Sequence, residues 1–191
     1  SKTPNDLIGV LAHETGHISG GHLARMGVEI DSANYTKIVG MLLGLATIAG
    51  GVASGNTEVA QAGQGIMAGS QGLAQRNFLT YARGMESSAD QAALGFLKAT
   101  QQSARGMINL FEKLASENIA VLADVDPYVM SHPMPMERVR NLEQEAKKSP
   151  YWDAKDPPAL MLRHELVQAK LTGYIGGAQA VAALAYGTAT I

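Results

Sequence analysis

The chain has 191 residues, long enough for one compact domain with a buried core and the beginning of a second. Apolar residues make up 46% of it and charged residues 17%, a balance typical of a folded protein. The formal net charge of -2 gives no sign of nucleic acid as a partner. Cysteine is absent, which excludes disulfides and thiolate ligands, so any metal must be held by His, Asp or Glu.

We predict a mainly α fold, because long alternating strand patterns are missing and glycine is abundant, as in closely packed helices. The first helix is expected to begin at Thr3, with Pro4 in its first position and Asp6 as the acid of a capping box. It should run through the histidines that follow and end near Gly20 and Gly21 or one turn later.

Further elements are expected in chain order. Residues 38–57 carry no charge, and residues 59–75 are rich in Gly, Ala and Gln. Prolines mark residues 119–135 as a loop, and composition marks 149–158 as a linker. Apolar residues at helical spacing predict helices over about 76–98, 103–117, 136–147, 159–172 and 177–187.

The sequence His13-Glu14-Thr15-Gly16-His17 is an H-E-x-x-H motif within the first predicted helix. Residues four apart share a helical face, so both imidazoles can reach one metal ion. Glu14 lies beside them, where its carboxylate can take a proton from a metal-bound water. This pattern indicates a zinc-dependent hydrolase.

A second His-Glu pair, His164-Glu165, begins in the same way but has Gln168 where the second histidine would stand. It can supply only one imidazole, and we interpret it as ordinary helix surface.

A catalytic zinc site needs a third protein ligand, and two candidates compete for that place. One is His22, but the H-E-x-x-H-x-x-G-x-x-H spacing of metzincins puts the third histidine one residue later, at Leu23. The other is Glu86, with Asp90 four residues on and on the same helical face. Glu86 can bind zinc while Asp90 accepts the far N–H of a ligand histidine, so we favour this pair.

The combination of His13-Glu14-x-Gly16-His17 with Glu86-x-x-Ala89-Asp90 resembles the gluzincin family that contains HtpX, the CAAX prenyl endopeptidases and the periplasmic BepA-type proteases (peptidase family M forty-eight). The downstream Ser131-His132-Pro133, with Arg138 five residues later, resembles that family's His-Pro…Arg element. The resemblance covers roughly residues 5–145. It implies one Zn(II) per chain, with His13, His17 and Glu86 as ligands and Glu14 as general base. Asp90 would hydrogen-bond to a ligand without itself binding the metal.

The same resemblance shapes the expected domains. Residues 1–148 would form the metallopeptidase core, 149–158 a linker, and 159–191 the start of a helical, tetratricopeptide-like region. Members of the family have a small β-sheet before the H-E-x-x-H helix. This sequence begins too late to contain that sheet, so we expect the core to be incomplete at its N-terminus.

The implied function is endopeptidase action on misfolded or unassembled proteins of the bacterial periplasm or cell envelope. Either His132 or Arg138 would assist the tetrahedral oxyanion. Alternatively, His132 could occupy the open coordination position and make the enzyme latent. A competing hypothesis is a chaperone-like scaffold that binds protein clients and retains its zinc site. The oligomeric state and the substrate stay open.

The uncharged residues 38–57 are just long enough to span a membrane. A single crossing would place His17 and Glu86 on opposite sides, although both must bind one zinc. The second crossing would have to lie in residues 59–75, which are too polar for a good span. We therefore favour a buried helix or helical hairpin in a soluble protein, and keep contact between residues 38–57 and a membrane surface as the alternative.

Overall fold

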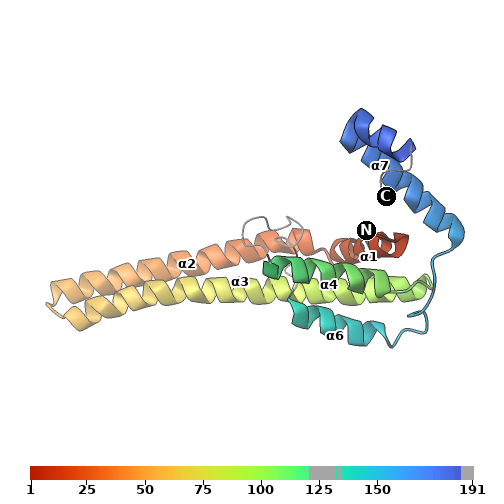
Figure 1. Cartoon of the computed structure of the whole chain (residues 1–191). Coiled ribbons are helices and arrows are strands. Elements are labelled where there is room, and N and C mark those ends of the chain that lie inside the picture. Colours follow the sequence, from red (N-terminus) through yellow and green to blue (C-terminus); the bar gives the residue numbers. More distant parts are fainter. Residues whose placement is uncertain (121–131, 133–134, 186–191) are drawn as a thin grey trace. The chain divides into compact units, whose positions relative to one another are not determined.

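The computed structural model describes residues 1–120, 132 and 135–185 (Figure 1). No strand occurs among these residues, which confirms the mainly α prediction. Most of the predicted loop over 119–135 lies outside the described residues, including Pro127 and Pro133. The helices are α1 (Pro4–Ser19), α2 (His22–Ala53), α3 (Thr57–Ala99), α4 (Arg105–Ala120), α6 (Met136–Ala146) and α7 (Pro158–Ala185).

Helix α1 begins with the predicted capping box. The Thr3 hydroxyl accepts the backbone N–H of Asp6 at 3.3 Å, and the Asp6 carboxylate accepts the backbone N–H of Thr3 at 3.1 Å. Two amide donors that no helical carbonyl can satisfy are thereby paired. The start of the helix that carries the motif is thus fixed by its own sequence.

Two compact units divide the chain. The core unit comprises residues 1–14 and 92–191, and the hairpin unit comprises residues 15–91. Helices α1 and α3 each contribute residues to both units. The predicted boundaries at 148 and 158 stay predictions.

In the core unit, α1, α3, α4 and α6 surround one apolar cluster, and α4 packs against α6. The Asn5 side chain ties the start of α1 to that of α4, because it donates to the Ser103 carbonyl at 2.8 Å and accepts the Gly106 amide at 2.6 Å. Gly106 permits this approach, since a Cβ there would lie 2.3 Å from the Asn5 carbonyl carbon. The cluster consists of Ala12, Ala93, Leu97, Ala104, Met107, Ile108, Phe111, Ala115, Val139, Leu142 and Ala146.

The predicted linker, residues 149–158, is part of the core unit and contacts the start of α4. The Ser103 hydroxyl donates to the Trp152 carbonyl at 2.6 Å, and the Arg105 guanidinium lies 4.7 Å from the centre of the Trp152 ring. Beyond it, α7 contains a non-helical residue at Gly177, with φ 63°, which agrees with two helices meeting at a glycine.

His164, on α7, is 8% exposed. Its interpretation as ordinary helix surface was therefore wrong. Helical spacing gives the direction of a side chain, but not what lies opposite it.

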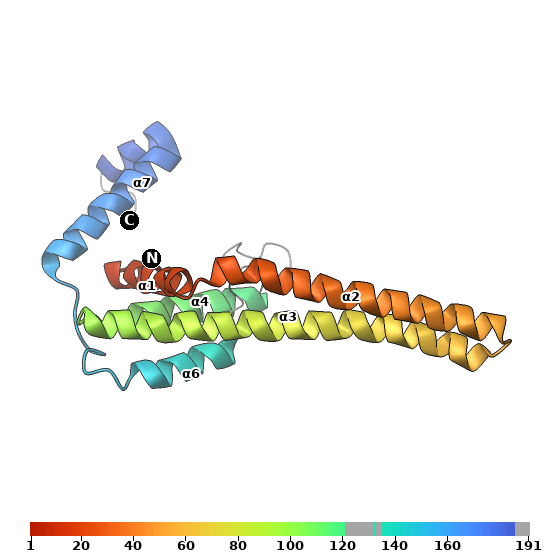
Figure 2. The same ribbon diagram turned by 180° about the vertical axis from the view of Figure 1, so that it is seen from behind.

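In the hairpin unit, α2 and the first half of α3 run antiparallel and side by side, as Figures 1 and 2 both show. Glycines set the short distance between them. A Cβ at Gly44 would lie 2.7 Å from the Gly63 carbonyl oxygen, and one at Gly51 would lie 2.4 Å from the Ala60 nitrogen. Residues 59–75 belong to α3, and the helix predicted over 76–98 is the second half of this longer helix.

Residues 38–57 form the later part of α2 and the turn before α3, which is one arm of a helical hairpin, and the predicted burial is wrong. Because the helices meet through small residues, the large apolar side chains point outward. Among the described helices, α2 is long and apolar enough to cross a membrane, judged by length and composition. Its exposed apolar residues in this stretch are Ile38, Met41, Leu42, Leu43, Leu45 and Val52.

Candidate metal centre

His13 is the first residue of the motif, and it belongs to the core unit. Its side chain is fully buried, and its ring meets the edge of the Phe111 ring with centroids 5.4 Å apart and planes at 88°. Phe111 is one of the largest buried side chains of the core. The packing therefore holds this imidazole in one orientation. The sequence predicts a helix over about 103–117, which contains Phe111, but gives no sign of this contact.

His132 and Glu14 also belong to the core unit. The His132 ring centre lies 5.3 Å from that of His13, and His132 Nε2 lies 3.6 Å from Glu14 Oε1. Within the described residues, that Glu14 oxygen accepts no hydrogen bond. A carboxylate oxygen placed this way can accept a proton from a water molecule in the site.

In the hairpin unit, the end of α1 lies directly on α3. A Cβ at Gly16 would stand 2.6 Å from the Ala89 carbonyl oxygen, so only glycine fits. This contact brings His17 Nε2 to 3.3 Å from Glu86 Oε1, and the Glu86 side chain is buried. Asp90 is buried one turn further along α3.

His22 lies against the opposite nitrogen of His17. The two Nδ1 atoms are 2.9 Å apart, and the ring planes meet at 83°. His22 is the first residue of α2 and follows Gly21, which has φ 62° in the left-handed region that glycine adopts easily. The sequence offered His22 as a metal ligand, and the structure places it beside a ligand candidate instead.

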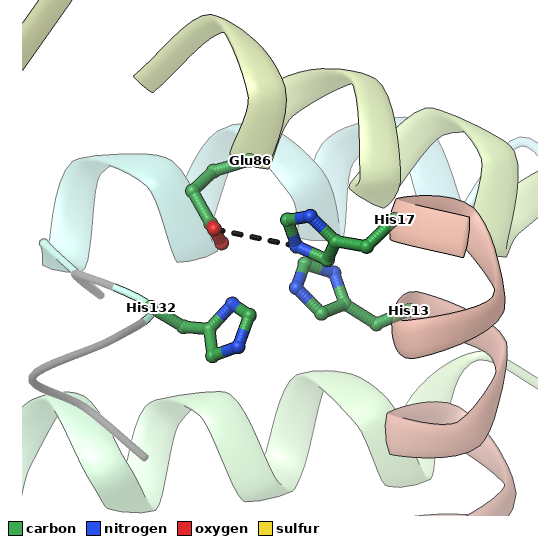
Figure 3. Close-up of side chains that lie close together, drawn as sticks. All are labelled: His13, His17, Glu86 and His132. Carbon is green, nitrogen blue, oxygen red and sulfur yellow. Dashed lines mark ion pairs between the residues drawn. The ribbon is translucent and has the colours of Figure 1, made fainter. Parts of the chain in front are cut away.

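Four residues carry atoms suited to one metal ion. Figure 3 shows His13, His17, Glu86 and His132 close together, and each offers one ligand atom within 4.8 Å of the others. A tetrahedral zinc with bonds of 2.0–2.1 Å separates its ligand atoms by about 3.3 Å. The His17–Glu86 separation of 3.3 Å matches this value, and imidazole with carboxylate suits zinc. The residues therefore fit the ion that the motif implies.

Arg138 is placed differently from His132. Its guanidinium carbon lies 5.8 Å from the centre of the Phe111 ring, and Phe111 in turn contacts His13. Of the predicted site residues, His13, His17 and Glu86 come together and His132 joins them. The oxyanion role predicted for Arg138 stays a prediction.

An H-E-x-x-H helix joined by a glutamate from a second helix defines a helical metal-dependent peptidase class. Residues 1–146 match the family described as Peptidase family M48, and the chain belongs to this family of metal-dependent peptidases. The resemblance seen in the sequence is thereby confirmed.

Two relatives are similar over most of this chain. A Vibrio cholerae protein with the provisional name beta-barrel assembly-enhancing protease is 27% identical over 188 residues, covering 96% of this chain and 35% of its own length. The beta-barrel assembly-enhancing protease of Yersinia pestis is 28% identical over 156 residues, covering 80% of this chain and 30% of its own. The chain thus spans about a third of each relative. No solved structure matches it.

Proposed function

We propose that this chain carries the catalytic site of a zinc-dependent endopeptidase. The observation that carries the proposal is the group of His13, His17, Glu86 and His132, whose ligand atoms lie within 4.8 Å of one another beside Glu14. Membership of Peptidase family M48 supports the same reaction class. One zinc per chain is expected, held by His13, His17 and Glu86.

When bound, zinc would polarise the scissile carbonyl and acidify a water molecule. Glu14 takes the proton of that water and passes it to the leaving amine nitrogen. Asp90 is buried one turn from Glu86, and it accepts a hydrogen bond from a ligand histidine without itself binding the metal. Arg138 is one of two candidates, with His132, for donating a hydrogen bond to the oxyanion.

His132 has two mutually exclusive roles in this proposal. Its position in the ligand group fits an imidazole that completes a tetrahedral site and leaves no place for the catalytic water. Its 3.6 Å separation from Glu14 fits equally an imidazole beside the reacting carbonyl, where it would stabilise the oxyanion. Only the first role makes the resting enzyme latent.

We propose misfolded or unassembled envelope proteins as substrates and the bacterial periplasm or envelope as the location. The relatives' names refer to assembly of beta-barrel proteins, and barrels of that kind lie in outer membranes. A protease that removes failed assembly intermediates would suit such a place.

Casein hydrolysis by the full-length protein tests the proposal. Proteolysis should require zinc, stop with a chelator and disappear in Glu14→Gln, since an amide cannot act as a base. Glu165→Gln is the matched control, because it changes an exposed glutamate in the second His-Glu pair. A wild-type protein that binds casein without cutting it would favour the chaperone-like scaffold.

We also propose that the hairpin contacts a membrane surface through residues 38–57. The exposed apolar side chains of α2 in this stretch support it. Wild-type protein should float with lipid vesicles, and a Leu42→Gln, Leu45→Gln double variant should float less. A Leu166→Gln, Leu171→Gln variant is the control, because both residues are exposed on α7. Equal flotation of the two variants would contradict the proposal.

A further inference from the structure

His17 directs its two ring nitrogens at different partners within the hairpin unit. Nε2 lies 3.3 Å from Glu86 Oε1, on the side of the other ligand candidates, while Nδ1 lies 2.9 Å from His22 Nδ1 (Figure 3 shows the first of these). Resting on the proposed function, the first nitrogen is the one that would bind zinc. The second is then the only ring nitrogen of His17 that can carry a proton.

The distance between the two Nδ1 atoms limits the protons between them to one. At 2.9 Å, two N–H groups would collide and two lone pairs would repel, whereas one N–H facing one lone pair makes a hydrogen bond of ordinary length. If His17 binds zinc through Nε2, its Nδ1–H must donate and His22 Nδ1 must accept. His22 then carries its own proton on Nε2.

We propose that His22 is a positioning residue, which sets the tautomer and ring orientation of His17 for zinc binding. Metal-ligating histidines generally donate their second N–H to an outer partner, most often a carboxylate, a backbone carbonyl or water. Here a neutral imidazole takes that place. It supplies an acceptor without adding a negative charge beside Glu86.

Two glycines before His22 allow its ring to lie beside His17. His22 is 4% exposed, and a Cβ at Gly20 would lie 2.3 Å from His22 Nε2, so the glycine leaves room for the ring. Gly21 turns the chain by adopting a left-handed conformation, which brings the first residue of α2 back towards α1. The spacing that disqualified His22 as a metzincin ligand is therefore what this contact requires.

Two variants separate the acceptor from the packing. His22→Phe keeps an aromatic ring but has no acceptor. His22→Asn loses the ring but keeps an acceptor oxygen three bonds from the Cα, the same number as His22 Nδ1. Zinc affinity is measured on the full chain by competition with a chromophoric chelator, and the metal-free variants are compared by thermal unfolding.

We expect His22→Phe to weaken zinc binding about 10–100-fold, as loss of an outer partner does, and His22→Asn to bind nearly as tightly as wild type. Both should still reach one zinc per chain at saturation. In the zinc-loaded wild type, long-range proton–nitrogen NMR spectra should show His17 protonated at Nδ1.

Three results would overturn the inference while leaving the proposed function standing. These are equal affinity in wild type and His22→Phe, equal loss in both variants, or metal bound at His17 Nδ1. A wild-type chain that binds no zinc would instead remove the proposed function, and this inference with it.

Discussion

Replacing Gly16 with alanine tests whether the close contact of α1 with α3 forms the metal centre. The new Cβ would stand 2.6 Å from the Ala89 carbonyl oxygen and 2.9 Å from the Ala89 Cα, where ordinary contacts begin at 3.4 Å. Both neighbours are backbone atoms, so no side chain can turn away. The helices must separate by about 0.8 Å, the shortfall between those contact distances.

That displacement is large for a metal site. Ligand distances in such sites are held to about 0.2 Å, and the His17–Glu86 separation would open from 3.3 Å towards 4 Å. We expect Gly16→Ala to weaken zinc binding at least about 10-fold, and to lower proteolysis about 100-fold, as a misplacement near 1 Å does. Helix propensity alone would stabilise the variant by about 1 kcal/mol, so a loss cannot come from a weaker helix.

The control is Gly84→Ala, on α3 two residues before Glu86. A Cβ there meets nothing within 4 Å, so this variant should gain helix stability and keep its zinc affinity. Chelator competition and thermal unfolding are measured on both variants. If Gly16→Ala binds zinc as tightly as Gly84→Ala, the close contact does not set the ligand geometry and the reasoning fails.

The other predictions concern the ligands and the fourth residue of the site. Purified protein should contain about one zinc per chain by elemental analysis, lost in His13→Ala, His17→Ala or Glu86→Ala. Retention of zinc in Glu86→Ala, with its loss in His22→Ala, would revive the metzincin-like alternative. His132→Ala should raise casein hydrolysis if the imidazole blocks the open position and lower it if the imidazole serves the oxyanion. Unchanged hydrolysis would discard both roles for His132.

Local signals in the sequence were enough to predict the helix that carries the motif. The capping box of Thr3 and Asp6 depends on residues three apart, and the shared face of His13 and His17 follows from helical periodicity. Glu86 needed one further step, a carboxylate at helical spacing from Asp90 on an otherwise apolar helix. Such features can be read because the residues that create them are neighbours in the chain.

Features that depend on distant segments could not be read in this way. The contact of Phe111 with His13 arises from packing between helices far apart in sequence, and helical spacing alone does not give the burial of His164. In the hairpin, the sequence predicted burial where the structure shows exposed side chains. Its apolar residues predicted a buried element, but glycines let the helices meet so closely that the larger side chains remain on the outside.

The hairpin also answers the topological objection to a membrane crossing. One crossing by residues 38–57 would separate His17 from Glu86, but α3 returns antiparallel to α2, so both residues belong to the same unit. Gln61 and Gln64 are exposed on the returning helix, and burying their amides in hydrocarbon without partners would cost several kcal/mol each. The composition therefore favours an α2 face resting on a lipid surface over a hairpin that crosses it.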